Sequence, residues 1–446
     1  MGPEWVAIIA LVALFAIGTA LPINMGALAY VAAWLVGTYS LNLDDKEILA
    51  GVSGDLILTL IGVTYLFAIA RNNGTVDLIV TQAVRAVGGR VALIPWVMFA
   101  VTALLTGIGA ASPAACAIIG PIALGFAGKY KINPLMMGMF VVHGAQGGGF
   151  SPISIYGTIT NSVMRDNGLE VGEMTLFLSS LAVNLIMASI LFVLLGGRQL
   201  MSQRIVANSD ELVDSLHTGG AQVTARGYGT SAPTGTHGSP GTNPRRVRTD
   251  QILTLFAFVG VAVVALAFDK NIGFVSITAA VVLAMLAPHE HKGAVNQIAW
   301  PTVLLVAGVS TYAAILTEAG SPEFVGKWAA GLGAAIVGAL ILCYVGGIVS
   351  AFASSTALLP IIIPIALPII AEHGISAVAL VAALAISSTI VDVSPFSTNG
   401  ALMLANRPDT IGEQVYYKQI LTYSVIVVAV GPLLVWAALV LPGWGS

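Results

Sequence analysis

Apolar segments of membrane-spanning length alternate with short polar loops along most of the chain. A membrane-spanning helix needs about 17 to 25 mostly apolar residues. Each half also holds a longer apolar stretch that small and polar residues interrupt, and we expect 91–127 and 334–370 to form re-entrant hairpins. The predicted fold is an all-α polytopic membrane protein, with two hairpins and about ten transmembrane helices near 5–22, 24–40, 54–71, 133–163, 173–197, 251–268, 272–288, 300–317, 375–406 and 419–441.

The two halves carry matching motifs at a constant offset of 243 residues: Ile118–Leu124 recurs as Ile361–Leu367, and Ser151–Gly157 as Ser394–Gly400. A chance likeness of two apolar helices would explain one match, but not several Pro, Ser and Gly matches in one register. We interpret the halves as a duplication. Five crossings in each half predict that the second copy runs inverted relative to the first.

Residues 199–249 separate the halves and are rich in Gly, Ser, Thr, Pro and Arg. This composition is typical of a flexible extramembrane linker. The predicted domains are therefore a first inverted repeat, 1–198, and a second, 250–446. The broken helices 133–163 and 375–406 and the last spans 173–197 and 419–441 occupy matching places in the two repeats.

The charge distribution predicts the orientation in the membrane. Only 9% of the residues are charged and 57% are hydrophobic, too few charges to cover a soluble protein of this size. With the linker in the cytoplasm, all Lys and Arg except Lys46, Arg165, Lys270 and Lys327 fall inside, as the positive-inside rule requires. We expect a multi-pass protein of the cytoplasmic (inner) membrane with both termini outside. No basic run predicts a nucleic-acid partner, and the two cysteines predict neither a disulfide framework nor a metal site.

Four places in the apolar halves share a pattern that starts a helix. Ser112-Pro113, Ser151-Pro152 and Ser394-Pro395 each put a capping serine before a proline suited to a first turn, and Ser354-Ser355-Thr356 occupies the fourth equivalent place. A half-helix N-terminus in mid-membrane presents free N–H groups and about half a positive charge. Four such ends predict a site for a dianion without a buried Arg, while the preceding helix ends offer carbonyls to Na⁺. The alternative is that the Ser-Pro pairs only kink ordinary spans.

Single polar residues suggest how ions are coupled. Asp392 is the acid expected deep in a span, so a cation ligand or proton carrier is the default hypothesis, with a carboxyl hydrogen-bonded at a helix break as the alternative. His143 and Gln146 lie close to the first break, and either binds within the site or is simply hydrogen-bonded in the bundle.

These motifs resemble the ion-transporter superfamily that includes the divalent anion:sodium symporters, and most closely the MatC-type malonate/dicarboxylate carriers. The resemblance rests on residues 1–163, especially Gly147 to Asn161, and on Ser354-Ser355-Thr356 with Ser394 to Gly400. It implies a homodimer in which a scaffold (5–71 and 251–317) holds a mobile transport domain that moves as an elevator. The hairpin tips lack the asparagine of the family's Ser-Asn-Thr signature, and we expect Asn161 and Asn399 on the broken helices to supply amides instead.

The predicted function is secondary active transport of a small dicarboxylate, malonate or a C4 acid such as succinate or malate, coupled to Na⁺. The alternatives are proton coupling, or a cation/proton antiporter of the same superfamily. An intramembrane serine hydrolase is rejected, so neither an enzyme nor a cofactor is expected. The candidate substrate residues are Ser112, Ser151, Ser154, Asn161, Ser354, Ser355, Thr356, Ser394, Ser397, Thr398 and Asn399. The candidate cation-coupling residues are Asp392, Ser112, Gly149, Ser355, Gly400 and His143.

Overall fold

The computed structural model describes residues 2–88, 90–201, 248–268, 270–288, 293–330, 335–351, 354–373 and 375–442. Most of the predicted linker lies outside these residues. The described parts are helical and contain no strand. The first half consists of α1 (Pro3–Ala20), α2 (Met25–Ser40), α3 (Asp45–Ala50), α4 (Gly54–Asn72), α5 (Thr75–Ala86), η1 (Val91–Leu93), α6 (Ile94–Gly107), α7 (Ser112–Tyr130), α8 (Pro134–Gly148), α9 (Ile155–Asp166), α10 (Glu173–Leu194) and α11 (Gly197–Leu200). The second consists of α13 (Thr249–Ala267), α14 (Ile272–Leu286), η2 (Ala294–Gln297), α15 (Trp300–Glu318), α16 (Ser321–Ala330), α17 (Ala335–Ser350), α18 (Ser355–His373), α19 (Ala377–Ile390), α20 (Thr398–Ala405) and α21 (Glu413–Leu439).

Five described helices, α4, α7, α10, α15 and α21, are long and apolar enough to cross a membrane. The predicted spans 24–40 and 272–288 are shorter as helices, because α2 has 16 residues and α14 has 15. At 1.5 Å per residue, α14 measures about 23 Å, less than the hydrocarbon core of about 30 Å. The predicted spans 133–163 and 375–406 each consist of two shorter helices, α8 with α9 and α19 with α20.

The outer surface is suited to lipid. Large apolar side chains are exposed along α10, α13, α14 and α21; Phe256 and Met285, for example, are 70% and 75% exposed. Water-soluble proteins rarely expose apolar patches of this extent. The exposed apolar helices therefore support the membrane assignment made from composition.

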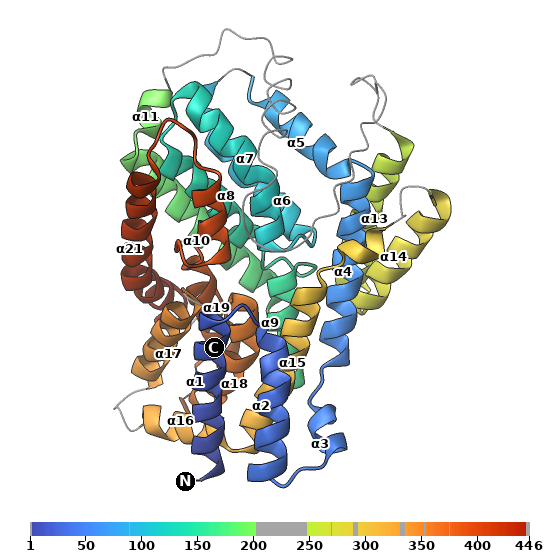
Figure 1. The fold of residues 1–446 in the computed structure, drawn as a ribbon, viewed down its shortest axis with the longest axis vertical. Helices are drawn as coiled ribbons and strands as arrows, with labels where there is room; N and C mark the ends of the chain where they lie inside the picture. Colours follow the sequence, from blue (N-terminus) through green and yellow to red (C-terminus); the bar gives the residue numbers. More distant parts are fainter. Residues whose placement is uncertain are drawn as a thin grey trace.

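Two helical hairpins occupy opposite ends of the molecule. The first consists of α6 and α7, and the second of α17 and α18. In Figure 1 the first hairpin lies in the upper half of the molecule and the second in the lower half. Both hairpins turn near the middle of the molecule, where the broken helices α8/α9 and α19/α20 are also interrupted.

The offset found in the sequence also relates the helix starts. From α7 to α18 the start moves from Ser112 to Ser355, and from α9 to α20 it moves from Ile155 to Thr398. Both pairs of helices are 243 residues apart, the offset of the motif repeat. The same short sequences therefore begin and interrupt helices at equivalent places in each half.

The halves are packed into one another rather than side by side. Helix α2 packs against α15, and α4 packs against α14. Glycines let the α2 and α15 backbones touch: a Cβ on Gly26 would lie 2.0 Å from the carbonyl oxygen of Leu304, and one on Gly308 would lie 2.0 Å from that of Gly26. The hairpins are exchanged in the same manner, since α7 packs against α20 and α18 against α9.

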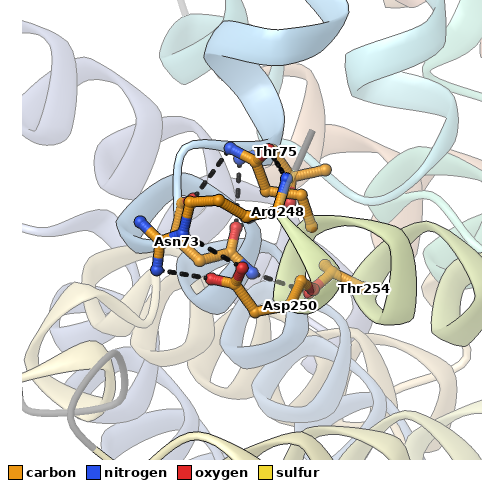
Figure 2. Close-up of polar contacts among 6 residues, drawn as sticks. Asn73, Thr75, Arg248, Asp250 and Thr254 are labelled. Atoms are coloured by element: carbon orange, nitrogen blue, oxygen red, sulfur yellow. Dashed lines mark hydrogen bonds and ion pairs between the residues drawn. The ribbon is translucent and has the colours of Figure 1, made fainter. Parts of the chain in front are cut away.

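A buried polar cluster ties the start of α13 to the junction of α4 and α5 (Figure 2). Asn73 donates through Nδ2 to Thr254 Oγ1 at 2.7 Å, and its Oδ1 accepts from the backbone N of Thr75 at 3.0 Å. Arg248 pairs with Asp250 at 2.8 Å, one residue before α13 begins. The first turns of α13, directly after the linker, are therefore bonded to the first half.

Candidate functional site: a cavity between hairpin tips and helix starts

The four interrupted elements meet at one cavity of about 650 Å³. Ser112 from the first hairpin lines it together with Ser354 and Thr356 from the second, and the breaks contribute Gly149 and Thr398. Other lining residues come from α1, from α15 and from the start of α2, including Asn24 and Thr302. The volume lies within the range of about 300–1,000 Å³ typical of small-molecule pockets.

The N-terminal ends of six helices line this cavity. Residues of the N-cap or first turn of α7, α9, α18 and α20 contribute to its wall, and so do those of α2 and α15. Among the described lining residues none carries a charged side chain. Free N–H groups and helix dipoles are therefore the source of any positive potential there, and each N-terminal end contributes about half a charge. Such a cavity is suited to bind an anion.

Serine caps start both half-helices that follow the breaks. Ser154 is the N-cap of α9, and its Oγ accepts from the backbone N of Gly157 at 3.3 Å. Ser397 caps α20 in the same way, accepting from Gly400 N at 3.3 Å. Each hydroxyl also lies within 2.7 Å of the carbonyl oxygen three residues earlier, that of Ser151 or Ser394. The two breaks thus share one hydrogen-bonding pattern.

The prediction that Ser112, Ser151 and Ser394 cap half-helices is wrong. α9 and α20 begin four residues after Ser151 and Ser394, because each Ser-Pro pair forms a turn inside the break: Ser151 Oγ accepts from Ile153 N at 3.4 Å. Ser112 is the first residue of α7, and the N-cap is Ala111, without a side-chain cap. Ser151 instead donates to the carbonyl oxygen of Gly107 at 2.6 Å, which joins the first break to the first hairpin.

Asp392 lies in the second break behind the wall of the cavity rather than on it. It is buried, and its Oδ2 accepts from Ser355 Oγ at 2.9 Å and from the Tyr156 hydroxyl at 3.4 Å. Ser355 also lies 2.8 Å from Ser350 Oγ and 3.2 Å from the carbonyl oxygen of Ser388. A carboxylate, two hydroxyls and a carbonyl form a cluster of oxygen atoms, the donor type that hard cations prefer.

The equivalent place in the first half has different chemistry. Ser112 corresponds to Ser355, but its Oγ accepts from Asn399 Nδ2 at 2.8 Å. Asp392 itself corresponds to Gly149, which has no side chain. Ser112 therefore meets an amide where Ser355 meets a carboxylate, and both partners, Asn399 and Asp392, belong to the second half.

His143 and Asn161 are not brought to the cavity. His143 faces α10 and α21, where Nδ1 lies 2.8 Å from Asn184 Oδ1 and Nε2 lies 2.6 Å from the Tyr423 hydroxyl. Asn184 Nδ2 donates to Ser180 O, so its Oδ1 must accept from His143 Nδ1–H. His143 is therefore hydrogen-bonded within the helix bundle, which was the alternative to a role in the site. Asn161 is buried on α9 and does not line the cavity, and its amide has no partner among the described residues.

Tyr156 is the functional candidate that sequence reasoning missed. It lines the cavity and also reaches Asp392. A signal was available, because Tyr156 lies 243 residues before Asn399, a predicted site residue. The change from amide to phenol between the copies hid the correspondence.

Clusters of classical metal ligands do not occur in the described parts of the chain: no group of three His, Cys, Asp or Glu side chains is placed to hold a metal ion. Both cysteines are free and buried.

An apolar helical chain with an uncharged cavity at the meeting point of broken helices has the architecture of a membrane transporter. Two solved structures share the fold. Neisseria gonorrhoeae MtrF, described as illuminating a class of antimetabolite efflux pumps, has a TM-score of 0.58 and 12% identity, covering 98% of this chain and 95% of its own. The YdaH transporter of Alcanivorax borkumensis has a TM-score of 0.56 and 13% identity, covering 100% and 99%.

The family matches specify the kind of transporter. Residues 1–149 match the dicarboxylate carrier protein MatC N-terminus, and residues 263–444 match the citrate transporter family. These matches confirm the resemblance to MatC-type dicarboxylate carriers of the ion-transporter superfamily and indicate a carrier rather than an enzyme. No protein with a curated description matches the chain.

Proposed function

We propose that this protein is a secondary active transporter that carries a small dicarboxylate such as malonate, succinate or malate together with a cation. The observation that carries the proposal is the convergence of six helix N-termini on a cavity without charged side chains. Four of these ends belong to the hairpins and broken helices. At about half a charge each they present roughly two positive charges, which matches a dianion.

The cation site is assigned to the cluster around Asp392. Its carboxylate, the hydroxyls of Ser355 and Ser350 and the carbonyl of Ser388 are suited to Na⁺. The same carboxylate would take up a proton if the protein were proton-coupled. A cation/proton antiporter would need Asp392 but not the anion cavity, so the cavity favours symport.

The alternating-access step is assigned to an elevator movement. In this proposal the halves are inverted repeats, α1, α2, α4 and α13–α15 form the scaffold, and the hairpins with the broken helices carry the substrate. The hairpins at opposite ends of Figure 1 and the reciprocal pairs α7/α20 and α9/α18 support it. The proposal includes a homodimer in the cytoplasmic membrane, with the linker inside and both termini outside, as the family resemblance and the positive charges suggest.

The test is transport by the purified protein in liposomes. Labelled malonate and succinate are followed under an inward Na⁺ gradient, under a pH gradient and under neither, both as uptake and as efflux from loaded vesicles. Accumulation that requires Na⁺ supports the symporter, and accumulation driven by pH alone assigns the proton to Asp392. Absence of dicarboxylate flux in either direction, with Na⁺/H⁺ exchange present, would replace this function with the antiporter.

A further inference from the structure

We propose that Tyr156 is the positioning residue that couples binding in the anion cavity to binding at the Asp392 carboxylate. This role rests on the proposed function and adds a mechanism of coupling to it. In this view the Tyr156 hydroxyl makes dicarboxylate binding and cation binding depend on each other.

Tyr156 has contact with both sites. It lines the cavity, and its hydroxyl lies 3.4 Å from Asp392 Oδ2. Asp392 and its other partner Ser355 do not line the cavity. Among the described residues, Tyr156 alone combines a place on the cavity wall with a hydrogen bond to this carboxylate.

The phenol ring of Tyr156 is held in place by packing, so only its O–H bond can rotate toward a different acceptor. Tyr156 is the second residue of α9, directly after the break. Its ring packs against Phe150 with 5.4 Å between centroids, and a Cβ on Gly149 would lie 2.8 Å from its Cδ2. Tyr156 and Phe150 are both buried. Gly149 thus leaves space for the ring where any side chain would displace it.

Two acceptors compete for the hydrogen of the Tyr156 hydroxyl: the Asp392 carboxylate and a substrate carboxylate. A phenol hydroxyl has one hydrogen, and in this structure it donates to Asp392, whose Oδ2 also accepts from Ser355. A substrate carboxylate in the cavity is a second acceptor for the same hydrogen. When the hydrogen turns to the substrate, the buried Asp392 carboxylate loses one of its two donors, which is unfavourable for a charged group. Binding of a cation or a proton at Asp392 then becomes more favourable.

Thermodynamic reciprocity makes the effect testable. If bound dicarboxylate strengthens cation binding, the cation must strengthen dicarboxylate binding by the same factor. Among the described residues, Cys116 on α7 also interacts electrostatically with Asp392, but it has no hydroxyl hydrogen to share with a substrate. Tyr156→Phe removes the shared hydrogen and keeps the ring. It should therefore weaken the coupling without removing either site.

The experiment measures the dissociation constant of succinate for the purified full chain, with and without saturating Na⁺, and at two pH values. The ratio of the two constants is the coupling factor. We expect this factor to fall by at least about threefold in Tyr156→Phe. Na⁺ should bind more tightly to substrate-free Tyr156→Phe than to the wild type, because its carboxylate already lacks one donor. A merely structural defect would not move both readouts in these directions.

Three further variants serve as controls for the role of the Tyr156 hydroxyl. Tyr39→Phe removes an exposed hydroxyl, and Tyr416→Phe removes a buried one that donates to the carbonyl oxygen of Pro134 at 3.2 Å; both should retain the coupling factor. Asp392→Asn should abolish coupling, and adding Tyr156→Phe should change nothing further. A wild-type coupling factor in Tyr156→Phe, with succinate still bound, would overturn the role of Tyr156 alone. Absence of dicarboxylate binding by the wild type would overturn both this role and the proposed function.

Discussion

Ser112 and Ser355 occupy equivalent positions at the starts of α7 and α18, yet their hydroxyls have different partners. Ser112 accepts from Asn399 and lines the cavity, whereas Ser355 donates to Asp392 behind it. We therefore expect the same substitution to give two phenotypes. Ser112→Ala should weaken succinate binding by about 2- to 10-fold, and Ser355→Ala should shift the Na⁺ concentration for half-maximal transport by a similar factor.

Both effects are measured by varying succinate and Na⁺ independently in the same transport assay. Ser189→Ala serves as the matched control, because Ser189 on α10 bonds only to its own helix at Leu185 O. Identical phenotypes for the two serines would mean that the difference between their partners has no functional consequence.

The sequence predicted the residue types at the site better than their contacts. Ser355 and Asp392 were identified because polar groups at breaks in apolar spans have few other uses. The bond between Asn399 and Ser112 joins residues 287 positions apart, and no local pattern indicates it. His143 shows the converse, since it satisfies the same rule but bonds to Asn184 and Tyr423 on helices far along the chain.

At the scale of single elements, the two breaks depend on glycines one turn into the following half-helix. A Cβ on Gly157 would lie 2.0 Å from Ser151 O, and one on Gly400 would lie 2.0 Å from Ser394 O. Because these contacts are to backbone, Gly157→Ala and Gly400→Ala should displace the start of α9 or α20. We expect succinate binding to weaken at least tenfold, since misplaced N–H groups no longer face the cavity.

The control for both variants is Gly125→Ala on α7, where an added Cβ meets nothing within 4 Å. This change should leave binding intact, because alanine favours the helix. Binding constants and melting temperatures are measured together. Wild-type binding in Gly157→Ala and Gly400→Ala would show that the starts of these half-helices do not contribute to the site.

Breaks were predictable from the sequence, but their inner geometry was not. Glycine, proline and serine in an apolar stretch indicate an interruption. Two serines three residues apart, Ser151 and Ser154, both fit the pattern of an N-cap, and only the fold decides between them. Ser154 caps because Ser151 and Pro152 are used in the turn that brings Ser151 Oγ to Gly107 O.

The junction of α4, α5 and α13 provides a test of stability independent of transport. Asn73→Ala removes the donor to Thr254 and the acceptor for Thr75, all of them buried. Loss of such a buried cluster costs about 1–3 kcal/mol. The melting temperature should therefore fall while the succinate affinity of the folded protein stays unchanged. Asn296→Ala, at an exposed position of the short helix η2, is the control and should leave the melting temperature unchanged.

At the scale of the whole molecule, the site exists only because the halves are exchanged. α7 of the first half meets α20 of the second, and α9 meets α18. Neither half alone would bring the four half-helix starts together. The equivalence of the helix starts was predictable from the 243-residue offset, but the participation of α2 and α15 was not, because nothing near Asn24 or Thr302 repeats a site motif.

The proposed inversion of the halves predicts where two exposed positions lie. Lys131 follows the second arm of the first hairpin, and Ala371 ends that of the second; both are exposed. If the hairpins enter from opposite faces, a cysteine at Ala371 is outside and one at Lys131 is inside. In a background with the buried Cys116 and Cys343 replaced by alanine, Ala371→Cys should react with an impermeant maleimide in intact cells. Lys131→Cys should react only after permeabilisation.

The orientation control is Asp45→Cys on the exposed helix α3, which the charge distribution places outside and which should label in intact cells. Labelling of Lys131→Cys and Ala371→Cys from the same side would rule out inverted halves and, with them, the elevator arrangement. Opposite but exchanged sides would keep the inversion and reverse the orientation, which would place the linker outside. Because each variant keeps the cavity residues, retained succinate uptake shows that the labelled protein is folded, so the labelling pattern reports topology alone.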